Sequence, residues 1–194
     1  NAAGEHGEWN QEIEKTVRKA DALYFGTLGQ REPSARAGIR KALAIAQDQN
    51  ILRILDINLR VPFYNHALIR ESIALCSVLK LSDEELAEVG QACEWAETLS
   101  DTDALGELRS KFGLDLVVMT RGAEGALLIH SDGIVEHPGV PVTVVDTVGA
   151  GDSFTASLTH GLLAGKEYAE ILENACKVAA RVCSHAGAVP ESEL

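Results

Sequence analysis

Apolar residues recur along the chain with two alternating periods, and this alternation predicts strands followed by helices. Short runs rich in aliphatic and β-branched residues predict strands, whereas longer segments with an apolar residue every three or four positions predict helices. Up to residue 120, strands are predicted at 22–25, 51–57, 78–81 and 114–119. The helices between them are predicted at 34–49, 67–75, 83–89 and 103–112. Such alternation is typical of a mostly parallel sheet with helices on both faces.

Beyond residue 120 the pattern changes to consecutive short strands. These strands are predicted at 126–130, 134–136 and 142–145, with glycine and proline turns between them. Two amphipathic helices, at 151–163 and 168–185, are predicted to end the chain. We therefore expect an α/β fold whose mostly parallel sheet has an antiparallel extension.

Polar residues stand where several predicted strands end. Asn58, Ser82, Thr120 and Asp146 each follow an apolar run. In open α/β sheets, ligands bind beyond the carboxyl ends of the strands. This edge of the sheet is therefore the predicted location of a functional site.

The most informative segment reads Asp146-Thr147-Val148-Gly149-Ala150-Gly151-Asp152. Its small residues stand between a predicted strand and a helix, so the first backbone N–H groups of that helix can approach an anion closely. Asp152 falls in the first helical turn, where a carboxylate stays ionised and can accept a proton from a hydroxyl. The alternative is an ordinary glycine turn before a helix that begins with Asp.

Net charge limits the classes of partner. The chain carries a formal charge of −12 and has a pI near 4.9, which argues against nucleic acid and anionic membranes as partners. No apolar run reaches the length of a membrane span, and the opening segment lacks the pattern of a signal peptide, so we expect a cytoplasmic protein. Cys76, Cys93, Cys176 and Cys183 lack the close pairs of a zinc site and are predicted to be core thiols.

The 146–152 segment resembles the D-T-x-G-A-G-D signature of the ribokinase-like sugar kinases, the phosphofructokinase-B family. Three further segments fall in that family's order along the chain. Residues 55–60 (LDINLR) resemble its D-x-N-x-R strand end, residues 80–86 (KLSDEEL) its N-x-x-E segment, and residues 117–126 (VVMTRGAEGA) its T-x-G-x-x-G turn. Together the four segments imply a ribokinase-like fold.

Members of the resembled family are about half as long again as this chain of 194 residues. The N-terminal part, which in the family carries the first strands and the lid over the sugar, has no counterpart here. We therefore expect residues 1–194 to form a single α/β domain, the C-terminal, nucleotide-binding portion of a sugar kinase.

The resemblance implies a role for each matching residue in phosphoryl transfer. Asp152 is the general base, and Gly149, Ala150 and Gly151 form the anion hole for the migrating phosphoryl group. Arg60 stabilises that group or pairs with an acidic sugar; its alternative is a surface arginine tied to Asp56.

The resemblance also implies a nucleotide and metal site, for ATP, Mg²⁺ and a monovalent cation such as K⁺. Glu85 would orient a metal-bound water and Asp146 would border the monovalent cation. The residues expected around the nucleotide are Ser82, Glu85, Thr120, Gly122, Gly125, Cys176 and Gly187, with Arg60 and Arg121 as basic side chains.

Each nucleotide residue has a plainer interpretation. Ser82 and Glu85 fit a helix capping box, and Gly122 and Gly125 fit a hairpin turn. Cys176 occupies the position where the family commonly has Asn, and Asn174 would replace it only with a shift of register. His185 fits a helix C-terminal cation better than a base.

We expect ATP-dependent phosphorylation of a sugar hydroxyl, with fructose ahead of 2-keto-3-deoxygluconate and ribose. The alternative is a catalytically inactive nucleotide-binding or interaction domain, and a homodimer remains open. A P-loop is excluded because the nearest string, Gly161 to Lys166, has the wrong spacing and is followed by Glu167. A dinucleotide-binding turn is disfavoured because Phe154 stands where the packing glycine is required.

Overall fold

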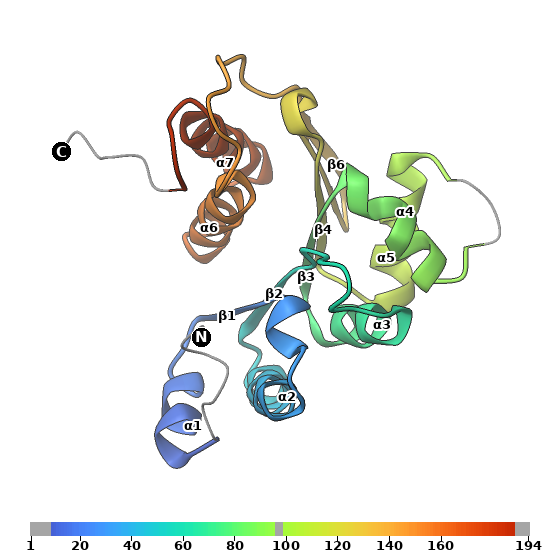
Figure 1. Cartoon of the computed structure of the whole chain (residues 1–194), viewed down its shortest axis with the longest axis vertical. Coiled ribbons are helices and arrows are strands. Elements are labelled where there is room, and N and C mark those ends of the chain that lie inside the picture. Colours follow the sequence, from blue (N-terminus) through green and yellow to red (C-terminus); the bar gives the residue numbers. More distant parts are fainter. Residues whose placement is uncertain (1–8, 96–98, 189–194) are drawn as a thin grey trace. The chain divides into compact units, whose positions relative to one another are not determined.

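A computed structural model describes residues 9–95 and 99–188 of the chain, which divides into two compact units, Asn1–Val117 and Val118–Leu194 (Figure 1). Its six strands follow one another in sheet order as they do in sequence. They are β1 (Ala22–Phe25), β2 (Leu52–Asp56), β3 (Val78–Ser82), β4 (Leu116–Thr120), β5 (Ala126–His130) and β6 (Gly133–His137).

Strand directions confirm the predicted mixed sheet. In the first unit β1, β2 and β3 are parallel, with Phe25 opposite Leu55 and Asp56 opposite Lys80. In the second unit β5 and β6 are antiparallel, with Ile129 opposite Ile134. The antiparallel pair is the predicted extension.

Local sequence signals set the helix ends of the first unit. Pro33 begins its longest helix, the Asn65 side chain accepts the Leu68 N–H at 2.8 Å, and Gly113 ends another helix in the left-handed conformation. The helices are α1 (Gln11–Val17), the 3₁₀ turn η1 (Leu28–Gln30), α2 (Pro33–Asp48), α3 (His66–Leu75), α4 (Asp83–Ala92) and α5 (Asp101–Phe112).

The core of the first unit is centred on β2 and β3. Ile54 and Leu55 are both fully buried, and so are Val78 and Leu79. Because consecutive residues of a strand point to opposite faces, both faces of these strands are covered. The continuous apolar runs in the sequence reflect this burial on two sides.

One ion pair interrupts that apolar core. Lys80 Nζ lies 3.2 Å from both carboxylate oxygens of Asp56, and the two residues are only 6% and 2% exposed. They are opposite partners in the parallel ladder, so the pair joins β2 to β3 through side chains as well as backbone. A buried charge without its counter-ion is strongly unfavourable.

Two packed helices dominate the second unit, α6 (Ala150–Leu163) and α7 (Tyr168–Cys183), which lie side by side in Figure 1. Their close approach depends on Gly161, where a Cβ atom would lie 2.7 Å from Ile171 Cγ1. Helix α7 also packs on β5 and β6, and the 3₁₀ turn η2 (Gly122–Glu124) leads into β5. None of the helices in the described ranges is long and apolar enough to cross a membrane.

The predicted buried strand at 142–145 is wrong. This segment has no strand structure, and Val144 and Val145 are 60% and 61% exposed. The Val145 and Asp146 amides both donate to Cys183 O, at 2.8 and 3.2 Å, so the end of α7 takes the hydrogen bonds that a neighbouring strand would take. The final helix also ends two residues before the predicted 185, and α6 begins one residue before the predicted 151.

We predict that Lys80→Met destabilises the protein by about 3–5 kcal/mol, because it leaves the Asp56 carboxylate buried without its counter-ion. Urea unfolding followed by circular dichroism measures the change.

Lys166→Met is the matched control, because Lys166 pairs with Glu170 at the exposed surface and such pairs contribute little. An unfolding midpoint that changes equally in both variants would show that the buried pair has no special role.

Candidate functional site

The turn before α6 has a conformation that requires glycine. Gly149 is the N-cap residue of the helix, with φ +83° and ψ −6° in the left-handed region. A Cβ atom there would also lie 2.8 Å from Ala188 O and 2.9 Å from Ala188 Cα. Gly149 therefore serves two purposes: it reverses the chain, and it lets the segment after α7 approach the turn.

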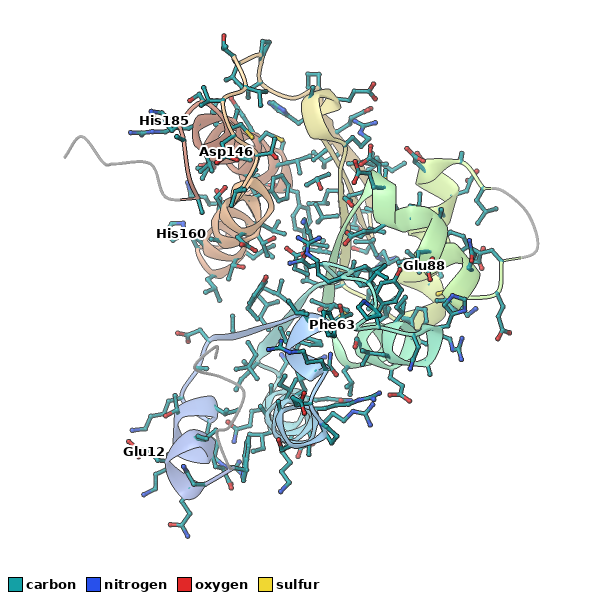
Figure 2. The ribbon with its side chains drawn as sticks, in the orientation of Figure 1. Glu12, Phe63, Glu88, Asp146, His160 and His185 are labelled. Atoms are coloured by element: carbon teal, nitrogen blue, oxygen red, sulfur yellow. The ribbon has the colours of Figure 1, made fainter. Side chains whose placement is uncertain are left out.

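The Asp146 carboxylate links the turn before α6 to the segment after α7 by hydrogen bonds. Asp146 Oδ1 accepts the Val148 N–H at 3.0 Å, within its own turn, and Asp146 Oδ2 accepts the Gly187 N–H at 2.9 Å. These backbone N–H groups, Val148 first, lower the pKa of the Asp146 carboxyl, which therefore remains ionised at neutral pH. Figure 2 shows Asp146 and His185 at the same end of the α6–α7 pair.

The first turn of α6 presents backbone donors. The Ser153 N–H makes the first helical bond, to Gly149 O at 2.9 Å, and the Ala150 N–H donates to Thr147 O at 3.2 Å. Helix geometry leaves the N–H groups of Gly151 and Asp152 without an intrahelical acceptor. Of the three residues predicted to form the anion hole, Gly151 thus has the amide most ready to receive an anion. The Asp152 side chain is exposed beside it.

A cavity of about 660 Å³ borders this turn within the second unit. Six of the predicted site residues line it, and four of these stand on different elements: Thr120 at the end of β4, Gly122 in η2, Gly151 on α6 and Cys176 on α7. The other two are Gly125 and Ala150. Most of the remaining wall is valine, alanine, proline and phenylalanine, so the cavity suits a flat apolar group with an anion at the helix end.

The glycines of the β4–β5 turn permit a close backbone crossing. A Cβ atom on Gly125, whose φ is +85°, would lie 2.0 Å from His137 O. On the opposing segment a Cβ atom on Gly139 would lie 2.4 Å from Ala123 O. Gly125 also lies in the turn between the neighbouring strands β4 and β5, where its carbonyl accepts the Arg121 N–H at 2.8 Å, which agrees with the hairpin-turn interpretation. The crossing with Gly139 forms one wall of the cavity.

Cys176 supplies a neutral wall to the cavity. Burial raises the pKa of this thiol to about 11, although the positive charge of Arg121 lowers the pKa in part. The side chain is therefore a protonated thiol at neutral pH. Cys76 and Cys93 are buried as predicted, whereas Cys183 is half-buried and lines the same cavity.

Arg121 is tied to protein acceptors at the edge of the site. Its Nη2 lies 2.7 Å from Glu136 Oε1 and 3.3 Å from Glu124 O. The predicted use of Arg121 as a basic contact for a nucleotide would thus require this guanidinium to exchange partners.

In the first unit, Glu85 connects two strand ends. Its Oε2 accepts the Ser82 N–H at 2.8 Å and the Ser82 hydroxyl at 3.0 Å, as the capping interpretation predicts. Its Oε1 accepts the Leu59 N–H at 2.7 Å. The carboxylate therefore fixes the segment after β2, where Asn58 has a positive φ of 39°.

Arg60 extends from that segment into solvent. Its Nη1 lies 3.4 Å from Leu59 O, and its own carbonyl accepts at 2.7 Å the N–H of Phe63, which is labelled in Figure 2. The structure gives no support to the alternative in which Arg60 is tied to Asp56, because the Asp56 carboxylate is paired with Lys80 and the Arg60 side chain donates to the Leu59 carbonyl. The Arg60 guanidinium is available to a ligand.

Sequence reasoning missed the backbone contacts of Leu59 in the first unit and of Gly139 and Ala188 in the second. Backbone contacts between distant segments leave no side-chain signal; only the Pro138-Gly139 turn was visible in the sequence. His185, at the end of α7, contacts Arg181 O through Nδ1 at 2.8 Å, as the C-terminal interpretation predicts. Among the described residues, no three His, Cys, Asp or Glu side chains converge on a metal-sized site.

The sequence profile described as "pfkB family carbohydrate kinase" matches residues 1–193. Aminoimidazole riboside kinase of Salmonella typhimurium is 33% identical over 150 residues, which cover 75% of this chain and 45% of the relative. A fructokinase of Rhizobium leguminosarum bv. trifolii is 36% identical over 147 residues, covering 73% and 43%. The chain thus spans less than half the length of these relatives.

Solved structures agree in fold. Aminoimidazole riboside kinase from Salmonella enterica, complexed with aminoimidazole riboside and an ATP analog, superposes with a TM-score of 0.75 at 30% identity, covering 89% of this chain and 59% of that one. A fructokinase double mutant from Vibrio cholerae O395, bound to fructose, ADP and potassium ion, has a TM-score of 0.76 at 26% identity, with coverages of 89% and 57%.

We predict that Gly149→Ala releases the segment around Gly187, because its methyl group would collide with Ala188. The Gly187 amide should then exchange with deuterium at least about tenfold faster, as expected when the free energy of opening its hydrogen bond falls by about 1.4 kcal/mol. Amide exchange measured by NMR tests this.

Gly165→Ala is the control, because Gly165 also has a positive φ, +63°, but a Cβ atom there meets nothing within 4 Å. Both variants carry the left-handed strain of about 1–2 kcal/mol, and only the first should change exchange at Gly187. Equal exchange rates in the two variants would contradict the collision.

Proposed function

Because the chain belongs to the pfkB family of carbohydrate kinases, we propose that it transfers the terminal phosphoryl group of ATP to a sugar hydroxyl. The observation that carries the proposal is the apolar 660 Å³ cavity that ends at the first turn of α6. An apolar cavity accommodates a purine ring, and helix N–H groups donate hydrogen bonds to the negatively charged oxygens of phosphates. The apolar part of the cavity thus suits the purine of a nucleotide, and the end at α6 suits its phosphates.

The nucleotide is proposed to lie between the β4–β5 turn and α7. Thr120, Gly122 and Gly125 border it on one side and Cys176 on the other. A protonated thiol offers no strong hydrogen bond to adenine, so shape and apolar contact replace the amide contact expected from Asn at that position. Gly187 acts indirectly, through its hydrogen bond to Asp146.

Asp152 is proposed as the general base. Its carboxylate takes the proton of the sugar hydroxyl as the hydroxyl oxygen bonds to the γ-phosphorus, and the bond to the β-phosphate oxygen breaks to release ADP. The turn Gly149–Gly151 receives the negative charge of the migrating group, chiefly through the Gly151 amide. Positioning and electrostatics then supply the catalysis, without a covalent intermediate.

Magnesium is proposed to be held mainly by the nucleotide phosphates and water. An ionised carboxylate has about four acceptor positions, and protein donors already occupy three on Glu85. Glu85 therefore fits a contact through a single metal-bound water, as Mg²⁺ sites commonly have. Asp146 keeps acceptor positions beyond its two backbone bonds, which supports a K⁺ site beside it.

Fructose is the proposed acceptor, with 2-keto-3-deoxygluconate and ribose as alternatives. The fructokinase relative supports the first choice. Aminoimidazole riboside kinase supports an acceptor that contains ribose. The second candidate function is a nucleotide-binding domain without catalysis, for which the cavity of the second unit would be sufficient.

We predict that Asp152→Asn lowers kcat with MgATP and fructose by about 10²–10⁴-fold, the usual contribution of a general base. The affinity for a non-hydrolysable ATP analog should stay within about twofold, since the exposed side chain does not line the cavity. Coupled ADP-release assays and calorimetry on the full-length gene product measure the two quantities.

Glu170→Gln is the control, because Glu170 is also a first-turn carboxylate, on α7. Unchanged kcat in Asp152→Asn would refute the proton transfer. Analog binding without turnover in the wild type would instead select the non-catalytic alternative.

We predict that Arg60→Ala lowers kcat/KM about tenfold for fructose, 2-keto-3-deoxygluconate and ribose alike, because the exposed guanidinium stabilises the transferred phosphoryl group. Arg18→Ala, which removes an exposed arginine paired with Glu14, is the control. A loss confined to the sugar acid would move Arg60 to the sugar carboxylate and place 2-keto-3-deoxygluconate ahead of fructose.

A further inference from the structure

A second cavity, of about 430 Å³, lies within the first unit and has the opposite chemistry. It lies beside η1 and α2, and three arginines line it: Arg31, Arg36 and Arg40. The other polar lining residues are Gln30 and Glu71. The lining side chains thus carry three positive charges and one negative, a balance of +2 in a chain whose net charge is −12.

Two of the arginines form a clamp. Arg36 and Arg40 are one helical turn apart on α2, so their side chains lie on the same face. Both donate through Nη2 to a single atom, Glu71 Oε2, with Arg36 at 2.6 Å. Desolvation raises the pKa of Glu71, but hydrogen bonds from Arg36 and the charges of both arginines outweigh it and lower the pKa, so the carboxylate is ionised. Glu71 occupies a position suited to an anion.

Residues that line the cavity carry buried polar atoms without a partner among the described residues. Gln30 is 3% exposed, and its Nε2 donates to Ser72 Oγ at 2.9 Å and Gly26 O at 3.2 Å. Its Oε1 has no donor among the described residues, nor do the buried Nε–H groups of Arg36 and Arg40 have acceptors there. Buried polar groups are nearly always satisfied, so the lining residues have unused capacity both to accept and to donate hydrogen bonds.

We propose that this cavity binds a phosphate group carried on a small hydroxylated molecule. The planar fork of arginine matches phosphate oxygens, and two forks one turn apart can bind the same dianion. The phosphate would replace Glu71 as the shared acceptor, and a hydroxyl of the ligand would donate to Gln30 Oε1. The site is in the first unit and does not depend on the proposed kinase activity.

Calorimetric titration of the chain with glycerol 3-phosphate, inorganic phosphate and glycerol tests the proposal. Glycerol 3-phosphate should bind at least about threefold more tightly than inorganic phosphate, and glycerol should not bind. Arg36→Lys and Arg40→Lys keep the charge but lose the fork, and each should weaken binding about tenfold. Glu71→Gln should strengthen binding several-fold, because it removes the competing carboxylate.

Lys41→Ala is the matched control, since it removes a positive charge next to Arg40 on α2 from a residue outside the cavity lining. Its affinity should remain within twofold of wild type. Unchanged affinity in Arg36→Lys and Arg40→Lys together with a loss in Lys41→Ala would reduce the effect to general charge attraction and overturn the site. No binding by wild type and by Glu71→Gln would overturn it as well, and equal affinities for the two phosphates would refute the hydroxyl contact with Gln30.

Discussion

The contact between Gly149 and Ala188 is the constraint on which the site of the second unit depends. The turn before α6 can take its left-handed form only with glycine, and the segment after α7 can approach it only because no Cβ intervenes. That approach brings the Gly187 N–H to Asp146. The first turn of α6, the end of α7 and the cavity wall between them are thereby fixed in one arrangement.

In each unit one carboxylate accepts hydrogen bonds from a nearby and from a distant backbone N–H group. Asp146 uses one carboxylate oxygen for an amide of its own turn and the other for an amide of a distant segment. Glu85 does likewise, with Ser82 as the local partner and the Leu59 amide as the distant one. Charged acceptors make strong hydrogen bonds to backbone N–H groups. In each unit one carboxylate therefore orders two loops that helices and strands alone would leave independent.

Most of the fold could be predicted from the sequence, because burial on both faces of β2 and β3 leaves continuous apolar runs. The predicted strand at 142–145 is wrong for the same reason, because an apolar run by itself indicates burial in a sheet. In the structure Val144 and Val145 are exposed, and the backbone of this segment is hydrogen-bonded to the end of α7. The glycine turn of the site was also visible, since its residue types dictate the geometry. The pairing of Arg121 with Glu136 and of Glu85 with the Leu59 amide could not be predicted, because these partners lie 15 and 26 residues away in sequence.

Lys80 shows why a charge in a sequence cannot be assigned to a surface or a site by type alone. It stands in an apolar run, where a lysine reads as the polar side of a strand, but it is buried against Asp56 on the neighbouring strand. The net charge of −12 likewise does not predict whether the chain can bind an anion, since it says nothing about hydrogen-bond donors at a particular place. Near α6 an anion would meet backbone N–H groups, whereas near α2 it would meet guanidinium groups. An acidic chain can thus offer two anion-binding environments, because each depends on a few oriented donors within hydrogen-bonding distance, where the distant carboxylates are screened.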